Sequence, residues 1–392
     1  MPTTIAANYV FTNTGDPIKN GAVTYDEHTG KILEVKMLTT ETANTKFYNG
    51  VLVPGFVNAH CHLELSHLRG LIPKCEHLVD FLQKVVQLQG NQVFNINDCQ
   101  SADQAMYIAG VNAVGDISNT PNSAPVKRNS RIRYRNFIEI IGTTSERIAH
   151  NHSTFQEVRK AFIDNDALPH SIHAVPHSPY LVSDAQFDDI NALNVNDLSI
   201  VSIHNQETAA ENELYISHTG SLADTFPKMA TNIHSTGKTS LQSYGHYLAD
   251  YENVLLVHNT YSQRDDFEYA LRTFKNPYFV LCPKSNLYLE QRLPDVATMK
   301  SLHLTLCFGT DSLSSNDTLS ILEEMKVIAQ NFRQFSFNEL LQMATINGAK
   351  ALNFADEFGT LQVGRTPGLV LLEDFDFQRF NVGAETRARR IC

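Results

Sequence analysis

Short apolar runs alternate with amphipathic helical patterns along most of the chain, and this alternation predicts repeated units of strand and helix. Eight apolar runs between residues 54 and 309 have the length expected of buried strands. The predicted strands are Pro54–His60, Val111–Ile117, Tyr134–Ile141, Ser171–Pro176, Leu198–His204, Val254–His258, Tyr278–Cys282 and Thr305–Gly309. Eight is also the number of parallel strands that closes a barrel.

Helical periodicity and loop composition fill the intervals between these strands. Apolar residues at helical spacing predict helices over Leu78–Val86, Leu319–Ile328 and Phe337–Ala349. The stretch Ser217–Ser243 is rich in Ser, Thr, Gly and Asn, which predicts an elongated loop or part of a lid after the fifth strand. The beginning and the end of the chain differ from this middle part, because both show short β-like runs separated by turn signals.

The composition is that of a globular protein with ample material for a core. The chain has 392 residues, of which 42% are hydrophobic and 19% are charged, and its length fits one large domain plus a smaller one. The net charge of −11 argues against a nucleic-acid partner or an anionic membrane surface. The densest basic cluster, Arg131, Arg133 and Arg135, alternates along a strand-like run, which predicts a single solvated or active-site-facing row rather than a basic patch.

Targeting signals and cysteine usage indicate where the protein works. The N-terminus lacks a basic region followed by a long apolar run, and no apolar stretch is long enough to span a membrane. Six cysteines are spread over the chain without a Cys-x-x-Cys spacing, which is typical of reduced thiols. The cytoplasm is therefore the predicted compartment.

A pair of histidines stands at the end of the first predicted strand. Cys61 alone separates His60 from His62, and strand side chains alternate between faces, so both imidazoles can reach one metal ion. Cys61 is expected to point to the opposite face, away from the ion. Two solvated histidines are the ordinary interpretation of so short a motif, so further ligands must be found elsewhere in the chain.

Three more predicted strands lead into residues that can bind a metal or move a proton. The fifth strand leads into His204 and Glu207, the sixth into His258 and the eighth into Asp311. Each alone is more often an ordinary polar residue where a strand meets a loop, but their joint occurrence favours one site. A barrel brings its strand ends together, whereas a doubly wound open sheet would not naturally do so for these four strands.

In these residues and their order the chain resembles the amidohydrolase superfamily. Within it, the chain is most similar to the mononuclear deaminases, a branch that includes cytosine, guanine, adenosine-type and aminodeoxyfutalosine deaminases. The shared motifs are Pro-Gly-Phe-Val-Asn-Ala-His-Cys-His at 54–62, the His-x-x-Glu of His204 and Glu207, the strand-end His258, and Gly-Thr-Asp-Ser at 309–312.

The resemblance implies an architecture for the whole chain. It is an α/β fold in which residues 54–355 form a (β/α)8 TIM-type barrel that carries the chemistry. The segments 1–53 and 356–392 would join into a small discontinuous β-sandwich domain, a pairing that the sequence pattern alone could not establish.

The resemblance also implies a metal centre. Carried over residue by residue, it makes His60, His62, His204 and Asp311 the ligands of one divalent ion. A second ion would need a bridging group at the end of the fourth strand, where the sequence offers neither a lysine nor a carboxylate. Zinc is favoured, with iron and manganese left open, because imidazole and carboxylate ligands suit all three. Such an ion lowers the pKa of a bound water from 15.7 towards about 7.

Glu207, His258 and Asp311 are the predicted catalytic residues. Attack on an amino-bearing ring carbon is difficult unless the neighbouring ring nitrogen is protonated, and Glu207 stands where it could deliver that proton. His258 and Asp311 could take a proton from the attacking water. In isolation, Glu207 would be interpreted as a helix N-terminal residue that the macrodipole stabilises.

Three further residues are predicted to contact the substrate. His177 resembles the family's strand-four histidine in a His-x-Pro-Tyr setting, although a buried histidine ordered by prolines is an equal alternative. Glu64 shares the face of His62 and could accept from a substrate NH or sugar hydroxyl, or else orient His62 or His67. Asn286 resembles a family position that lines the pocket.

The predicted function is that of a metal-dependent hydrolytic deaminase. It would convert an amino-substituted N-heterocycle, purine-like or adenosine-like, to the oxo product plus ammonia. The alternatives are an amidohydrolase acting on a cyclic amide, a chlorohydrolase and, more remotely, a catalytically silent barrel that binds a metabolite. The expected partner is a small heterocyclic substrate, and a homo-oligomer is possible.

Overall fold

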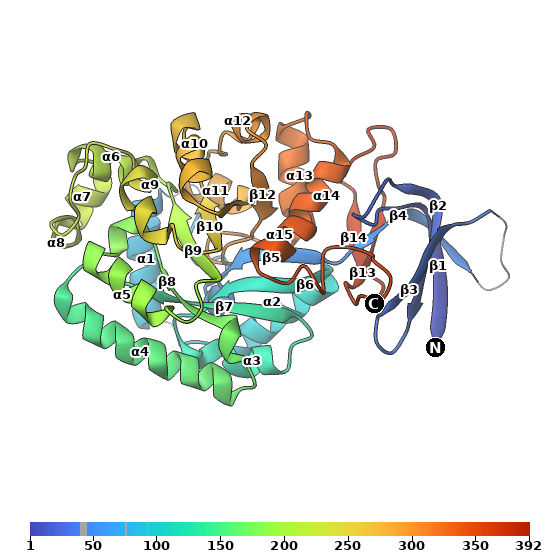
Figure 1. Cartoon of the computed structure of the whole chain (residues 1–392), viewed down its shortest axis with the longest axis horizontal. Coiled ribbons are helices and arrows are strands. Elements are labelled where there is room, and N and C mark those ends of the chain that lie inside the picture. Colours follow the sequence, from blue (N-terminus) through green and yellow to red (C-terminus); the bar gives the residue numbers. More distant parts are fainter. Residues whose placement is uncertain (40–44, 75–76, 92) are drawn as a thin grey trace.

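Three β-sheets form the framework of the chain (Figure 1). The coordinates are a computed structural model, which describes residues 1–39, 45–74, 77–91 and 93–392. One sheet has six strands and joins the two ends of the chain, and the other two have four parallel strands each.

The two parallel sheets contain all eight predicted strands, with boundaries within two residues of those expected. One sheet has the order β5–β6–β7–β8 and the other the order β12–β11–β10–β9. Their strands are β5 (Phe56–Cys61), β6 (Val111–Ile117), β7 (Arg133–Ile140), β8 (Ile172–Pro176), β9 (Ile200–Asn205), β10 (Asn253–His258), β11 (Asn276–Leu281) and β12 (Thr305–Phe308). One boundary is corrected, because Pro54 ends β4 and does not begin the first parallel strand.

The edges of the two parallel sheets meet at the C-terminal ends of their strands. Between β8 and β9, the backbone N–H of His204 donates to the carbonyl of His177 at 3.0 Å. Between β12 and β5, the N–H of Thr310 donates to the carbonyl of His60 at 2.9 Å, and Cys61 forms a parallel bridge with Asp311. The loops after these strands are therefore held close to one another.

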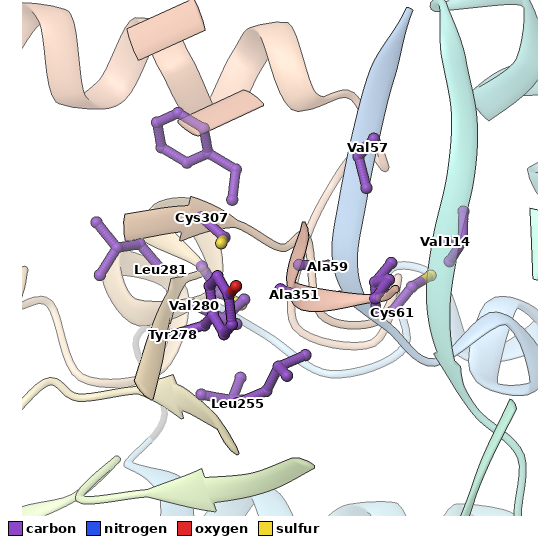
Figure 2. Close-up of a cluster of buried hydrophobic side chains, with 14 of the residues drawn as sticks. Val57, Ala59, Cys61, Val114, Leu255, Tyr278, Val280, Leu281, Cys307 and Ala351 are labelled. Carbon is purple, nitrogen blue, oxygen red and sulfur yellow. The ribbon is translucent and has the colours of Figure 1, made fainter. Parts of the chain in front are cut away.

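Apolar side chains from both parallel sheets pack into a common core (Figure 2). Val57 and Ala59 of β5 lie in this core with Leu255 of β10 and Val280 of β11. Every residue of β5, β6, β8, β9 and β10 is buried, as expected of parallel strands that are covered on both faces. The polar residues at the strand ends are thus fixed by a rigid scaffold.

Helices follow most of the parallel strands and cover them. They are α1 (Leu78–Asn91), α2 (Ile96–Ile108), α3 (Ala124–Arg128), α4 (Ser145–Asp164), α5 (Asp184–Leu193), α6 (Ala209–Ser217), α10 (Arg264–Thr273), α11 (Pro283–Leu289), α12 (Val296–Ser301) and α13 (Ile321–Asn331). Among the residues described, no helix combines the length and the apolar character needed to cross a membrane.

Two predicted segments differ from the structure. The single helix expected over Phe337–Ala349 is two helices, α14 (Phe337–Ala344) and α15 (Ile346–Ala351). The break is at Thr345, which lies outside the helical region and whose hydroxyl is tied to Leu341 and Asn13. The polar stretch after the fifth strand is not a continuous loop, because it contains α7 (Ser221–Thr225), α8 (Pro227–Ala230) and α9 (Ser240–Tyr244).

The six-stranded sheet brings the N- and C-terminal segments together, as predicted. Its order is β14–β13–β4–β1–β2–β3. The strands are β1 (Pro2–Val10), β2 (Ile18–Asp26), β3 (Ile32–Met37), β4 (Lys46–Pro54), β13 (Leu369–Glu373) and β14 (Arg387–Arg390). β4 and β13 pair in antiparallel fashion, and this pairing joins the two segments. The segments form one sheet, and the second layer of a sandwich stays a prediction.

Candidate metal and catalytic site

The four predicted metal ligands lie together at the C-terminal ends of the parallel strands. Nε2 of His62 is 3.3 Å from Nε2 of His204, and Oδ1 of Asp311 is 3.5 Å from Nε2 of His62 and 3.8 Å from Nε2 of His60. His60, His204, His258 and Asp311 each offer one ligand atom within 4.8 Å of the others. All five side chains are buried, so the cluster is a shielded group of nitrogen and oxygen ligands.

Local backbone geometry at the strand ends aims these side chains inwards. His258 has a φ of +73° and Asp311 a φ of +57°, conformations that side-chain-bearing residues rarely adopt. Gly309 lets the loop after β12 approach β5 closely, because a Cβ there would lie 2.8 Å from the Cβ of His60. The Asn58 amide bonds the Thr310 hydroxyl at 2.7 Å and fixes this approach.

The histidines of the cluster are prepared to bind a cation as neutral imidazoles. Nδ1 of His204 lies 2.7 Å from the carbonyl of His177, a contact that fixes the proton on Nδ1 and leaves Nε2 as an acceptor. Burial, followed by the neighbouring imidazoles, lowers the pKa of His204 far below its usual value and also lowers that of His62. Neither ring nitrogen of His60 has a hydrogen-bond partner among the residues that the structure describes, although the ring is buried. These residues therefore fit a metal ion.

The Asp311 carboxylate is the predicted ligand that carries a negative charge. The hydroxyls of Ser285 and Ser315 donate to Oδ2 at 2.6 and 2.5 Å, so Oδ1 is the oxygen that faces the histidines. Burial acts to raise the pKa of Asp311, but the interaction with His60 and the other imidazoles holds it well below its usual value. The group is therefore an anion at neutral pH.

Glu207 and His258 lie side by side next to the cluster. Oε1 of Glu207 is 3.4 Å from Nε2 of His258, and both side chains are buried. Burial, together with the charges of Asp311, Glu290 and Glu211, raises the pKa of Glu207 well above its usual value. Burial lowers the pKa of His258 to about 4. These shifts favour a protonated Glu207 and a neutral His258.

Glu139 at the end of β7 is a member of the site that the sequence did not reveal. Its Oε1 is 2.7 Å from Nδ1 of His177 and 3.5 Å from Nδ1 of His204. Burial opposes ionisation, but His177 holds the pKa of Glu139 down to about 2, and Glu139 in turn raises the pKa of His177. With His62 and His204, Glu139 makes a second group of close ligand atoms.

Residues 51–385 match the Amidohydrolase family. The chain belongs to the amidohydrolase family. It is 26% identical over 352 residues to the 5-methylthioadenosine/S-adenosylhomocysteine deaminase of Saccharophagus degradans, an alignment that covers 84% of this chain and 73% of the relative. The identity is spread over most of both chains, so the similarity is not confined to a short motif.

Two solved structures share the fold of this amidohydrolase. Helicobacter pylori aminofutalosine deaminase in complex with methylthio-coformycin is 23% identical, with a TM-score of 0.79 over 95% of this chain and 93% of that chain. The adenosine deaminase of Xanthomonas campestris with bound zinc is also 23% identical, with a TM-score of 0.74 over 95% of this chain and 84% of that chain. Helices and strands of this amidohydrolase thus follow a known arrangement from end to end.

The three predicted substrate residues of this amidohydrolase differ in how far their side-chain polar atoms are already engaged by other protein groups. His177 lies beside His204, with ring centroids 4.5 Å apart, and Asn286 faces Nδ1 of His258 at 3.3 Å through its side-chain oxygen. The carboxylate of Glu64 accepts from the backbone N–H groups of Asn119 and Thr120, each at 3.0 Å. Both Glu64 oxygens are therefore engaged by the loop after β6.

Cys61 points away from the cluster, as its place in the strand predicts. Its thiol packs in the apolar core near Val114 of β6 (Figure 2) and is not part of either group of close ligand atoms. Burial, followed by the charge of Asp116, raises the pKa of the Cys61 thiol well above its usual value. The Cys61 sulfur therefore lies in the core and not among the clustered histidines.

Proposed function

We propose that this amidohydrolase is a metal-dependent hydrolytic deaminase that acts on an adenosine-like substrate and releases ammonia. The observation that carries the proposal is the buried Glu207, 3.4 Å from His258 and beside the histidine cluster. A carboxylic acid that keeps its proton at neutral pH is what protonation of a ring nitrogen requires. The names of the similar proteins point to the same class of substrate.

One divalent ion, which we propose is zinc, would be held by His60, His62, His204 and Asp311. Neutral imidazoles and a carboxylate are ligands that zinc uses in hydrolytic enzymes, and the low pKa values of His62 and His204 leave their nitrogens free to bind. The zinc named with the Xanthomonas campestris enzyme supports this choice. When bound, such an ion lowers the pKa of water, so that hydroxide is available at neutral pH.

The chain's own groups would move the protons. Glu207 donates its proton to the ring nitrogen beside the amino-bearing carbon, which prevents negative charge from accumulating on the ring. His258 and Asp311 accept the proton of the attacking water; His258 is free to do so because its pKa is near 4. One of the two water protons then passes to the amino group, which leaves as ammonia, the other returns to Glu207, and the carbon keeps the oxygen.

His177 and Asn286 are proposed to contact the substrate. The Glu139 carboxylate holds Nδ1 of His177, which leaves the other ring nitrogen to face the cluster side. Asn286 lies against His258, so its side chain also borders the reacting groups. For Glu64 we propose a positioning role, since its carboxylate holds the backbone of the loop at Asn119 and Thr120.

The same proposal extends to architecture and location. The edge contacts between β8 and β9 and between β12 and β5 support closure of the two parallel sheets into a TIM-type barrel over residues 54–355. Residues 1–53 and 356–392 would form the second domain around the six-stranded sheet. All the cysteines that the structure describes are free thiols, which supports a reducing compartment such as the cytoplasm.

Ammonia release from a panel of adenosine derivatives, purines and pyrimidines tests the proposal. We expect turnover of at least one adenosine derivative by the zinc-loaded protein, and a loss of about 10²–10⁴-fold in kcat for Glu207→Gln. Zinc content should be unchanged in that variant, and Glu268→Gln, at a partly exposed position on α10, serves as the matched control. Product masses that show an opened ring or a lost chloride, with no ammonia, would contradict deamination.

A further inference from the structure

A cavity of about 790 Å³ lies at the opposite end of the parallel strands from the metal ligands. It is bounded by the first residues of β7, the end of α4, the turn after α15 and the last residues of the chain. Arg133 at the start of β7 lines it, whereas Glu139 of the same strand contacts His177 in the catalytic site. Six residues of extended chain span about 20 Å, so the two places are separate.

The walls of this cavity are rich in cationic side chains although the chain as a whole carries a net charge of −11. Three carboxylates line it, and two of them form exposed ion pairs at its margin, Asp166 with Arg128 and Glu357 with Arg133. The cationic side chains of the wall are those of Lys127, Arg128, Arg131, Arg133, Arg135 and Arg390. Lys127 is paired with the buried Asp116 at 2.5 Å, and Asp197 is the third carboxylate. The excess of positive charge therefore comes from Arg131, Arg135 and Arg390, and it favours an anion here.

Three of the arginines have no Asp or Glu partner within 4 Å in the part of the chain that the structure describes, namely Arg131, Arg135 and Arg390. Arg131 and Arg390 both lie on the ring of Tyr107, with their guanidinium carbons 4.0 and 3.8 Å from its centroid. Because both guanidinium carbons lie so near one ring centroid, the two cations are close neighbours. Their mutual repulsion is relieved when an anion binds close by.

The two more deeply placed arginines are held rigidly by main-chain oxygens. Arg135 donates to the carbonyls of Leu352 and His170, and it is only 5% exposed. Arg390 donates to the carbonyls of Tyr107 and Val111 at 2.6 and 2.8 Å and to that of Cys392 at 3.0 Å. A guanidinium cannot lose its proton at neutral pH, so these charges are permanent and fixed in place.

We propose that this cavity is a second ligand site that binds a phosphate-bearing small molecule. Arg131 forms no hydrogen bond to the described protein, so all its N–H groups are free to bind phosphate oxygens in the bidentate manner that guanidinium groups favour. The fixed charges of Arg135 and Arg390 add to the attraction. The volume matches that of small-molecule sites, and is larger than one phosphate group alone requires.

Calorimetric titration of the zinc-loaded, full-length protein with glucose 6-phosphate, and in parallel with glucose, tests the proposal. We expect glucose 6-phosphate to bind with a Kd of about 1 mM or tighter and glucose not to bind. Arg131→Gln should weaken binding about tenfold, and Arg131→Lys should weaken it less, because it keeps the charge but loses the planar fork. Affinity should fall as salt is raised.

Two controls separate this site from other cationic surfaces. Arg272→Gln removes another exposed guanidinium group, on α10, and should leave the affinity unchanged. Arg131 is exposed and makes no hydrogen bond to the described residues, so Arg131→Gln removes only its contact with the Tyr107 ring and should shift the melting temperature of the free protein by less than about 4 °C. The absence of phosphate-dependent binding, or an affinity that is the same in Arg131→Gln as in the unmodified protein, would overturn the proposal.

Discussion

At its C-terminal end, strand β7 places the Glu139 carboxylate 2.7 Å from His177, whereas at its N-terminal end it places Arg133 and Arg135 in a cavity wall. The first environment collects imidazoles and carboxylates, which suit a cation. The second collects guanidinium groups, which suit an anion and would repel a metal ion. One strand thus contributes opposite chemistry at its two ends.

Parallel strands make this separation possible. Because they all point the same way, their C-terminal ends gather at one edge and their N-terminal ends at the other. Alternation along a strand determines on which face of the sheet a side chain lies. The position of the residue along the strand determines whether it lies near the C-terminal or the N-terminal ends of the parallel strands. The possibility of an active-site-facing row for Arg131, Arg133 and Arg135 is therefore wrong, since these residues stand at and before the start of β7.

Removal of the metal should give the largest difference between the two ends of the parallel strands, because it should affect ammonia release and not phosphate binding. Dialysis against a chelator is expected to lower the rate of ammonia release on the order of 10³-fold, because a bound ion supplies several kcal/mol of stabilisation to the reaction. Added zinc should restore the rate. The affinity for glucose 6-phosphate, measured on the same chelated sample, should not change. A parallel loss of both properties would mean that the two ends are not independent.

Glutamine substitution at Glu139 should give the next largest effect. Glu139→Gln removes the charge that holds His177 and that contacts His204, so we expect a fall of about 10–100-fold in activity or metal affinity. Arg133→Gln is the matched change at the other end of β7. Arg133 forms an ion pair with Glu357, and both side chains are about half exposed, so its loss should alter the rate by less than about twofold. Steady-state kinetics and zinc content of both variants measure the difference.

The strands and most of the site could be predicted because their signals are local. Each predicted ligand follows an apolar run directly, and His60 and His62 have the spacing that puts both on one face of a strand. The gathering of these residues depends on the order of strands around two sheets, which the periodicity of one segment does not contain. The resemblance to a family supplied that part.

Residues whose role depends on pairing across the fold were harder to find. Glu139 lies inside an apolar run of β7 and precedes no motif, so only its contact with His177 reveals its place in the site. A buried carboxylate in a strand is itself an unusual pattern and could have served as the signal. Glu64 shows the reverse case, because its sequence position suggested a ligand contact while its oxygens bind the backbone at Asn119 and Thr120.

The smallest expected effect is a shift in the pH dependence of kcat/KM. His258 must be neutral to accept a proton, and its pKa is near 4, so activity should fall as the pH drops through about 4. Glu207 must be protonated to donate, and burial raises its pKa well above the usual 4.5, so activity should fall only when the pH rises through that higher value. The rates at pH 6 and pH 7 should therefore be similar, since an acid with a pKa of about 4.5 would give a tenfold fall over that interval.

Glu290 offers a way to move the alkaline limb of this profile. Its charge raises the pKa of Glu207, and its carboxylate also accepts from the backbone of Leu78 and from the hydroxyl of Tyr261. Glu290→Gln removes the charge while it keeps an acceptor, so the alkaline limb should shift to lower pH and the acidic limb near pH 4 should stay in place. Arg131→Gln, at the other end of the strands, should shift neither limb. An alkaline limb that stays at the same pH in Glu290→Gln would show that a group other than Glu207 provides the proton.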